Sequence, residues 1–314
     1  MRPPSTTASA TPIASSHLMT KPMDGTQRIS LRIAPASPRS LAILAERAKP
    51  EDRARKLRQN GEIALRLAVI ADIHGNLPAL EAVLHDIRQR GADRTVNLGD
   101  CVSGPLWPRE TIDLLGQLDL PTVRGNHDRW VAETPRERMY ASDAFAFDAL
   151  TANQRTTLGA LPARCRLGKS IAAVHGRPGD DNDYLLENVI EGQLALAPVE
   201  TITARIGRMQ TPLLLCAHSH LPRVVHAGAA TLIVNPGSVG CPAYFDPNPP
   251  SHVSAAGSPH ARYALLDKRS GRWIVELIAV EYDWNAASAR ALKNGRHEWA
   301  QGLATGFLSP PTTA

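Results

Sequence analysis

Polar residues of a few types recur in this sequence directly after short apolar runs. They form five blocks, which are Asp72-Ile73-His74, Gly99-Asp100, Gly125-Asn126-His127-Asp128, His175-Gly176 and His218-Ser219-His220. Each apolar run is typical of a β-strand, so each block is expected where a strand ends. Because α/β proteins bind ligands in loops beyond the carboxyl ends of their strands, the five blocks are predicted to converge on one site.

The residue types in these blocks indicate metal chemistry. Imidazole and carboxylate groups bind Mn, Fe, Co, Ni or Zn. In Asp72-x-His74 and His218-x-His220 the paired side chains lie two residues apart, on one side of an extended chain. Two adjacent cations polarise phosphoryl oxygens and lower the pKa of a bound water toward ~7, and a nearby imidazole can protonate the leaving oxygen. The reaction predicted from these residues is hydrolysis of a phosphate ester.

The order of the blocks resembles the calcineurin-like metallophosphoesterase superfamily, whose pattern is D-x-H, G-D, G-N-H-[DE], a single His and G-H-x-H. All five blocks occur in that order within residues 72–220, and the one departure is Ala217, where the family usually has Gly. The segments ADIHGN at 71–76 and NPGSVG at 235–240 are similar to the bacterial phosphodiesterase-like branch. The resemblance extends over residues 65–303.

This resemblance implies a role for each polar residue of the blocks. The first ion would be held by Asp72, His74 and His220, and the second by Asn126, His175 and His218. Asp100 would bridge the two ions, and it is counted with His127 as catalytic. His127 would protonate or orient the leaving-group oxygen, and Asn126 and His127 would also contact the substrate. The implied cofactors are two divalent ions, with manganese favoured over nickel, iron, zinc or cobalt.

The favoured function is a phosphodiesterase that acts on a small or nucleotide-type substrate, and other functions stay open. Enzymatic alternatives are a phosphomonoesterase or protein phosphatase and a dinucleoside polyphosphate hydrolase. Protein phosphatases usually continue the second block as G-D-x-V-D-R-G, whereas residues 99–105 here read GDCVSGP, without that arginine. The non-enzymatic alternative is a metal-binding interaction scaffold, but such relatives typically lack the histidine that is present here as His127.

Several further side chains are candidates for the site or its supports. Asn76 is interpreted as a helix cap rather than a phosphate ligand, and Cys101 as a packing residue. Asp128 is expected either to cap a helix or to orient His127. Candidates to stack on a base or aryl group are Trp107, Trp130, Tyr184, Tyr244 and Phe245, and candidates to meet phosphate charge are Arg129 and Arg177.

The elements that must position these blocks alternate between apolar runs and amphipathic segments from Leu65 onward, which predicts an α/β layered fold. Strands are predicted at 65–71, 94–98, 121–124, 212–216, 223–226, 231–235, 262–267 and 273–281, with a further pair within 163–174. Helices are predicted at 77–90, 109–118, twice within 142–160, and once or twice within 284–303. The expected architecture is a four-layer α-β-β-α sandwich of two mixed sheets flanked by helices, with the metal site at the strand C-terminal ends.

Composition divides the chain into a domain and flanking segments. Residues 1–39 are rich in Ser, Thr, Pro and Ala and are predicted to be a disordered tail. Residues 40–60 are predicted to be a linker with short helices, 61–305 the metallophosphoesterase domain, and 306–314 a second tail. The first 60 residues hold eleven Lys or Arg and four Asp or Glu, whereas the remaining 254 hold 24 and 26. The body is therefore not a polycation, and polymeric nucleic acid is not indicated as a partner.

Cysteine usage and hydropathy bear on the compartment. The four cysteines are widely spaced and form no C-x-x-C pair, so reduced thiols are expected. No run of 18 apolar residues occurs, and no compact apolar segment at the N-terminus predicts a secretory signal. We therefore expect a cytoplasmic protein that acts on a small phosphorylated substrate and does not span a membrane. The sequence leaves open whether it forms a homo-oligomer.

Overall fold

The structure is a computed structural model that describes residues 65–209, 211–228 and 230–309. The predicted tail at 1–39 and the linker at 40–60 lie outside the described residues, as do residues 310–314 of the second tail. Within the described ranges, no helix is long and apolar enough to cross a membrane.

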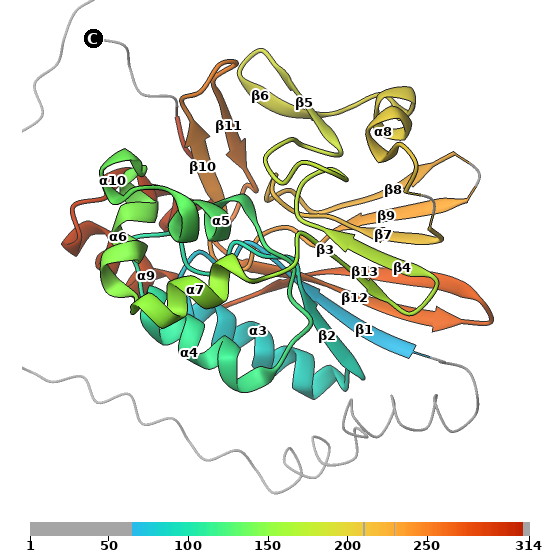
Figure 1. The fold of residues 1–314 in the computed structure, drawn as a ribbon, viewed down its shortest axis with the longest axis horizontal. Helices are drawn as coiled ribbons and strands as arrows, with labels where there is room; N and C mark the ends of the chain where they lie inside the picture. The colour runs from blue at the N-terminus through green and yellow to red at the C-terminus, as the bar shows by residue number, and fades with distance from the viewer. Residues whose placement is uncertain (1–64, 210, 229, 310–314) are drawn as a thin grey trace, which may run out of the picture. The chain divides into compact units, whose positions relative to one another are not determined.

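Two mixed sheets form the centre of the fold (Figure 1). The first has the order β13-β12-β1-β2 and comprises β1 (Leu65–Ile70), β2 (Arg94–Asn97), β12 (Ala261–Arg269) and β13 (Arg272–Val280). The second has the order β3-β4-β7-β9-β8 and comprises β3 (Arg164–Leu167), β4 (Ile171–Val174), β7 (Leu213–Leu215), β8 (Arg223–Ala227) and β9 (Thr231–Asn235). Strands β1 and β2 run parallel, as do β4, β7 and β9, so the polar blocks that follow them emerge on one side of each sheet.

The alternation of side chains along β1 shows how the first sheet is buried on both faces. Leu67 and Val69 enter a core that they share with strands of the second sheet, whereas Ala68 and Ile70 enter a core shared with helices. All four side chains are fully buried. A strand buried on both faces carries an unbroken apolar run, which is why residues 67–70 are recognisable as a strand from sequence.

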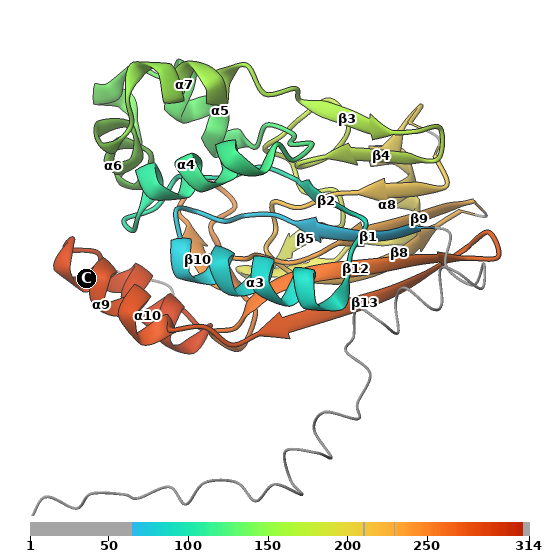
Figure 2. The same ribbon diagram turned by 90° about the horizontal axis from the view of Figure 1, so that it is seen from below.

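Helices pack on the outer face of the first sheet, as the two views show (Figures 1 and 2). The helices of the described residues are α3 (Leu77–Arg90), α4 (Pro108–Leu118), α5 (Asn126–Glu133), α6 (Ala141–Ala149), α7 (Ala152–Gly159), α8 (Val199–Ile206), α9 (Trp284–Lys293) and α10 (His297–Thr305), with a 3-10 turn at Arg136–Arg138. Helix α3 illustrates the local signals. Asn76 caps its first turn by accepting from the backbone N–H of Ala79 at 3.3 Å, and Gly91 ends it in the left-handed region at φ 67°.

The structure also departs from the sequence-based expectations. A third sheet, in the order β10-β11-β6-β5, is formed by β5 (Glu187–Ile190), β6 (Gln193–Leu196), β10 (Ala243–Asp246) and β11 (His252–Ala255). None of these four-residue strands has a long enough apolar or alternating run to be predicted. The strand predicted at 121–124 is wrong, because this segment makes only a single bridge between Thr122 and Asn97. Helices α5 and α8, of eight residues each, were not predicted.

Candidate metal centre

The five polar blocks meet beyond the strand ends. Asp72 and His74 follow β1, Asp100 follows β2, and His175 follows β4 directly. His218 and His220 follow β7, whereas Asn126 is the first residue of α5. Within the described residues, the ligand atoms form two groups in which all atoms lie within 4.8 Å of one another, namely Asp72, His74 and His220, and Asp100, His175 and His218.

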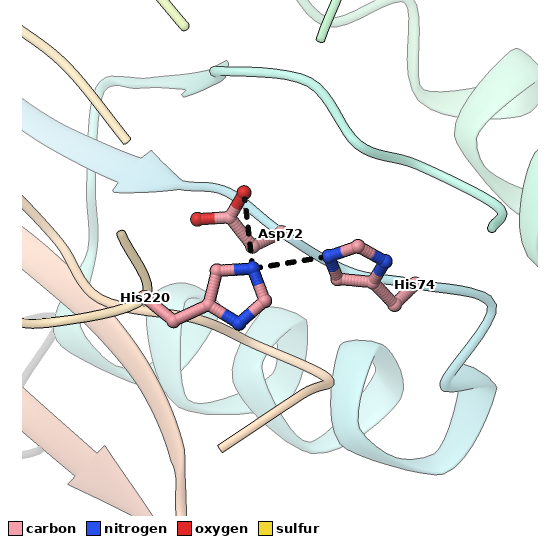
Figure 3. A group of neighbouring side chains, drawn as sticks. All are labelled: Asp72, His74 and His220. Carbon is pink, nitrogen blue, oxygen red and sulfur yellow. Dashed lines mark hydrogen bonds and ion pairs between the residues drawn. The ribbon is translucent and has the colours of Figure 1, made fainter. Parts of the chain in front are cut away.

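The first group brings two histidines and one carboxylate to a common point (Figure 3). The Nε2 atoms of His74 and His220 lie 3.1 Å apart, and Nε2 of His220 lies 3.7 Å from Oδ1 of Asp72. Figure 3 shows the three side chains pointing toward one another from two separate loops. This arrangement of imidazole and carboxylate suits a divalent transition metal.

The second group lies beside the first, and its carboxylate, that of Asp100, comes near a histidine of the first group. Nε2 of His175 lies 3.2 Å from Oδ2 of Asp100 and 3.0 Å from Oδ1 of Asn126. Oδ2 of Asp100 is also 3.9 Å from Nε2 of His74, a member of the first group. The carboxylate of Asp100 therefore faces both groups, which is the position that a bridging ligand requires.

Backbone carbonyls orient the histidine rings. The Nδ1 atoms of three rings lie 2.6–2.7 Å from carbonyl oxygens, in the pairs His74 with Ser103, His175 with Leu98, and His220 with Cys241. An Nδ1–H that donates to a carbonyl leaves Nε2 as the nitrogen that faces the centre and can ligate an ion. His218 differs, because its Nε2 lies 2.9 Å from the carbonyl of Asn182, which leaves Nδ1 for coordination.

The burial of Asp72 tests whether these residues fit a metal. Its side chain is 0% exposed, and within the described residues neither carboxylate oxygen accepts a hydrogen bond of normal geometry. Burial, reinforced by the charge of Asp100, raises the pKa of Asp72 to about 8. The charge of His175 and the backbone N–H of His218 lower the pKa of Asp72 and oppose the effect of burial in part. A buried carboxylate without a hydrogen-bond partner is costly, and a divalent cation would satisfy both oxygens.

The pKa values of the histidines in the two groups are lowered, as suits neutral metal ligands, except for that of His175. Burial lowers the pKa of His74 to about 4, and desolvation together with the charge of His175 lowers that of His218 to about 3. Burial also lowers the pKa of His175, but Asp100 outweighs this effect and raises it to about 10. A divalent ion would displace the proton of His175, as metal binding commonly does. The position between Asp100 and His175 therefore attracts positive charge.

The backbone at the ligands is strained. Among the described residues, eight non-glycine residues have a positive φ, and five of these belong to the two groups: Asp72 at 53°, His74 at 51°, Asp100 at 55°, His218 at 70° and His220 at 60°. The left-handed region is costly for residues with a Cβ, and strain of this kind persists where the surrounding structure imposes it. The strained backbone therefore coincides with residues whose side chains converge in the two groups.

The segment 235–240 imposes part of this geometry. Ser238 Oγ donates to the carbonyl of Asp72 at 2.8 Å, and the backbone N–H of Gly240 donates to the same carbonyl at 3.0 Å. The Asn235 amide donates to the carbonyl of Ala217 at 3.0 Å. A Cβ on Gly240 would collide with the carbonyl of Ile73, so only glycine fits there. The NPGSVG segment thus links the loops that carry Asp72 and His218.

His127 lies beside the two groups without belonging to either. Its ring Nδ1 lies 2.7 Å from Oδ1 of Asp143, a buried residue in the first turn of α6, and Ser103 Oγ donates to the same oxygen at 2.6 Å. Desolvation opposes protonation, but Asp143 and Asp100 raise the pKa of His127 to about 9. The side chain is 25% exposed and lines the cavity described below. Asp143 therefore fixes the His127 ring and favours its protonated form.

The residue that orients His127 was not identified from the sequence. Asp128 was expected either to cap a helix or to orient His127, and it accepts the backbone N–H groups of Asp100, Cys101 and Gly125 at 2.8–3.0 Å. It thereby fixes the loop of Asp100 and the start of α5. No local pattern around Asp143 indicates its role, because an Asp in the first turn of a helix is ordinary.

Two sequence interpretations agree with the observed contacts. Asn76 caps α3, and its amide also donates to the carbonyl of Gly240 at 3.0 Å and to the hydroxyl of Tyr282 at 3.1 Å, so it is engaged away from a substrate. Cys101 is 1% exposed in the core between the first sheet and its helices, with the amide of Asn97 at 3.3 Å from its sulfur.

A cavity of about 730 Å³ opens over the centre. Four of the five aromatic candidates line it, namely Trp130, Tyr184, Tyr244 and Phe245. The fifth, Trp107, does not line it and instead packs with residues of α9 and α10. Arg129 and Arg177 do not line it either, since they pair with Asp181 and Asp183 beside a separate cavity.

A hydrogen-bonded set of aromatic residues supports His218. The Tyr184 ring stacks on His218 with 4.8 Å between centroids. Nδ1 of His252 lies 2.8 Å from the carbonyl of Pro250, so its Nε2 accepts from the Tyr184 hydroxyl at 2.7 Å. The Tyr184 oxygen in turn lies 2.7 Å from the hydroxyl of Tyr244. His252 has no polar block around it, and its role could not be read from the sequence.

Comparison with known proteins agrees with this site. Residues 65–255 match the family model described as calcineurin-like phosphoesterase superfamily domain. An uncharacterized protein of Methanocaldococcus jannaschii is 28% identical over 259 residues, which cover 74% of this chain and 94% of that protein.

Solved structures show the same fold. A metallophosphoesterase from Sphaerobacter thermophilus matches with a TM-score of 0.61 and 26% identity, covering 78% of this chain and 100% of that chain. A hypothetical protein from Pyrococcus horikoshii OT3 matches with a TM-score of 0.62 and 23% identity, covering 78% and 99%. Because the family model spans more than half of the sequence and the site lies within it, this chain belongs to the calcineurin-like phosphoesterase superfamily.

Proposed function

We propose that this protein is a metal-dependent phosphodiesterase that hydrolyses a small or nucleotide-type substrate. The observation that carries the proposal is the position of His127, which is held by Asp143 at the wall of an aromatic-lined cavity, beside the two groups of candidate ligands. When bound, two divalent ions would polarise the phosphoryl oxygens and activate the attacking water. The donor set is imidazole and carboxylate rather than all oxygen, which supports a first-row transition ion, and among these we propose manganese.

Residues of the chain would position the proton donor and supply the proton for the leaving group. Asp143 binds Nδ1 of His127, which leaves Nε2 to donate a proton to the leaving oxygen. Asp100 accepts the backbone N–H of His127 at 3.0 Å and so fixes the imidazole relative to the ligand groups. One water is consumed: its hydroxide adds to phosphorus, the ester P–O bond breaks, and the alcohol leaves with the proton from His127. His127 recovers a proton as the site resets.

The cavity favours a diester with a planar group over a phosphoprotein. Trp130 lies 4.8 Å from His127 between ring centroids and 6.0 Å from Tyr140, so aromatic faces and edges begin next to the proposed proton donor. The block after Asp100 lacks the arginine that protein phosphatases use. The test is a panel of bis(4-nitrophenyl) phosphate, 4-nitrophenyl phosphate, nucleotide diesters and phosphoserine peptides. Faster hydrolysis of the peptides than of every diester would refute the substrate assignment.

Removal of metal is expected to abolish hydrolysis. Treatment with excess chelator, followed by dialysis, should leave no measurable turnover of bis(4-nitrophenyl) phosphate, and Mn²⁺ should restore it. The reason is that the buried carboxylates of Asp72 and Asp100 provide ligands but no nucleophile suited to attack at phosphorus. Metal analysis before and after chelation gives the occupancy, and full activity in a sample shown to be metal-free would contradict the proposal.

Substitution of Asp143 should impair the proton donor and leave the ligand groups loaded. In Asp143→Asn, the amide can no longer stabilise a protonated His127, so kcat should fall by about tenfold or more for a poor leaving group. Metal content should stay at the wild-type level. Asp148→Asn, on the exposed face of the same helix, is the matched control and should keep full activity. Loss of metal in Asp143→Asn would show that Asp143 supports the ligands rather than His127.

A further inference from the structure

The cavity over the metal centre has a wall that the family model does not include. That model ends at residue 255, whereas α9 and α10 span 284–305. Five consecutive or nearly consecutive residues at the start of α10 nevertheless line the cavity, namely Arg296, His297, Glu298, Trp299 and Gln301. The Trp299 ring lies 5.9 Å from that of His74, so this wall reaches the first ligand group.

The two C-terminal helices are anchored firmly to the loop that precedes α4. The Asn294 amide donates to the carbonyl of Pro105 at 2.8 Å, and Nε of Arg290 donates to that of Leu106 at 3.3 Å. Leu106 is buried in a small apolar core with side chains of both helices. At the C-terminal end of α10, the backbone N–H of Gly257 donates to the carbonyl of Gly306 at 3.0 Å. Arg296 therefore begins α10 on a fixed support.

Arg296 is the one arginine or lysine among the described residues that line this cavity. Its Nε donates to Oε1 of Glu298 at 2.6 Å, and within the described ranges its two terminal nitrogens bond to no acceptor. Its side chain is 21% exposed. Cys241, whose backbone carbonyl lies 2.7 Å from Nδ1 of His220, lines the same cavity as Arg296.

We propose that Arg296 forms a second anion subsite, which binds a phosphate of the substrate other than the one that is hydrolysed. This inference rests on the proposed function and specifies its substrate class as a nucleotide-type diester that carries an additional phosphate. A guanidinium binds phosphate through its paired terminal N–H groups. Glu298 fixes the orientation of the Arg296 guanidinium by accepting a hydrogen bond from its Nε. The aromatic side chains that line the same cavity provide the surface for the base or aryl group.

The experiment compares two substrates that differ by one remote phosphate. Thymidine 5′-(4-nitrophenyl phosphate) and its 3′-phosphorylated form share the same scissile bond and leaving group. For the Mn²⁺-loaded wild type, KM should be lower for the 3′-phosphorylated compound. In Arg296→Gln, KM for that compound should rise about tenfold or more, with kcat and the KM of the unphosphorylated compound nearly unchanged. Arg296→Lys should recover part of the preference.

A matched control and a second measurement keep the two proposals separate. Lys293→Gln removes one positive charge from the exposed end of α9 and should retain the preference. Equal KM values for both compounds in the wild type would overturn the subsite. An equal rise in KM for both compounds in Arg296→Gln would do the same. If wild type hydrolyses neither compound nor bis(4-nitrophenyl) phosphate, the proposed function fails. Binding alone is then measured by tryptophan fluorescence titration with thymidine 3′,5′-bisphosphate and thymidine 5′-phosphate. The wild type should bind the bisphosphate more tightly, and Arg296→Gln should lose this difference. Equal affinities in the wild type, or a difference that survives in Arg296→Gln, would overturn the subsite.

Discussion

Asp100→Asn is expected to lower kcat/KM by about 10³-fold or more and to reduce bound metal below two ions per chain. The carboxylate of Asp100 is 1% exposed and lies 3.2 Å from Nε2 of His175 and 3.9 Å from Nε2 of His74. A neutral amide keeps the shape of the side chain but removes the negative charge that faces both groups. The charge of two buried cations would then be offset by Asp72 alone.

The measurement combines metal analysis of the purified variant with steady-state kinetics on bis(4-nitrophenyl) phosphate. Asp119→Asn is a suitable control, because Asp119 is exposed, remote from the centre and in a left-handed conformation that asparagine tolerates well. Folding is checked by the thermal unfolding of both variants. Retention of two ions with wild-type affinity in Asp100→Asn would exclude a bridging role for this residue.

His127→Ala is expected to slow hydrolysis by about 10²-fold or more for substrates with a poor leaving group, while metal content stays near the wild-type level. The histidine belongs to neither ligand group, and its ring is held by Asp143 rather than by a ligand. Asn126, the preceding residue, reaches the second group with its own side chain. The two neighbouring residues therefore have separable roles.

The dependence on the leaving group is the sharper measurement. A 4-nitrophenolate leaves without needing a proton, so aryl esters should lose less activity than alkyl or nucleoside esters. A plot of log kcat against leaving-group pKa should thus be steeper for His127→Ala than for the wild type. His85→Ala, which removes an exposed histidine on α3, is the control. A uniform loss across all leaving groups, or loss of bound metal, would contradict the role as proton donor.

Much of the fold and the set of candidate ligands could be predicted from sequence because both are encoded over short distances along the chain. The apolar run of β1, the cap and apolar face of α3, and the β12–β13 hairpin with Gly271 in the left-handed region each depend on residues within one element. The candidate ligands could be nominated because four of the five polar blocks follow a strand, and parallel strands end on one side of a sheet. Their order along the chain also resembled a known family.

Tertiary structure decided what depends on residues far apart in sequence. The third sheet joins strands of four residues whose pairing, such as Val253 with Gln193, has no local signature. Asp143 reaches His127 only because α6 packs beside α5. Arg296 reaches the cavity because α9 and α10 return to the loop at Pro105 and Leu106. Sequence periodicity and caps determine which residues form an element, whereas packing between elements determines which side chains meet. The candidate ligands could therefore be predicted from the sequence, and the residues that contact them could not.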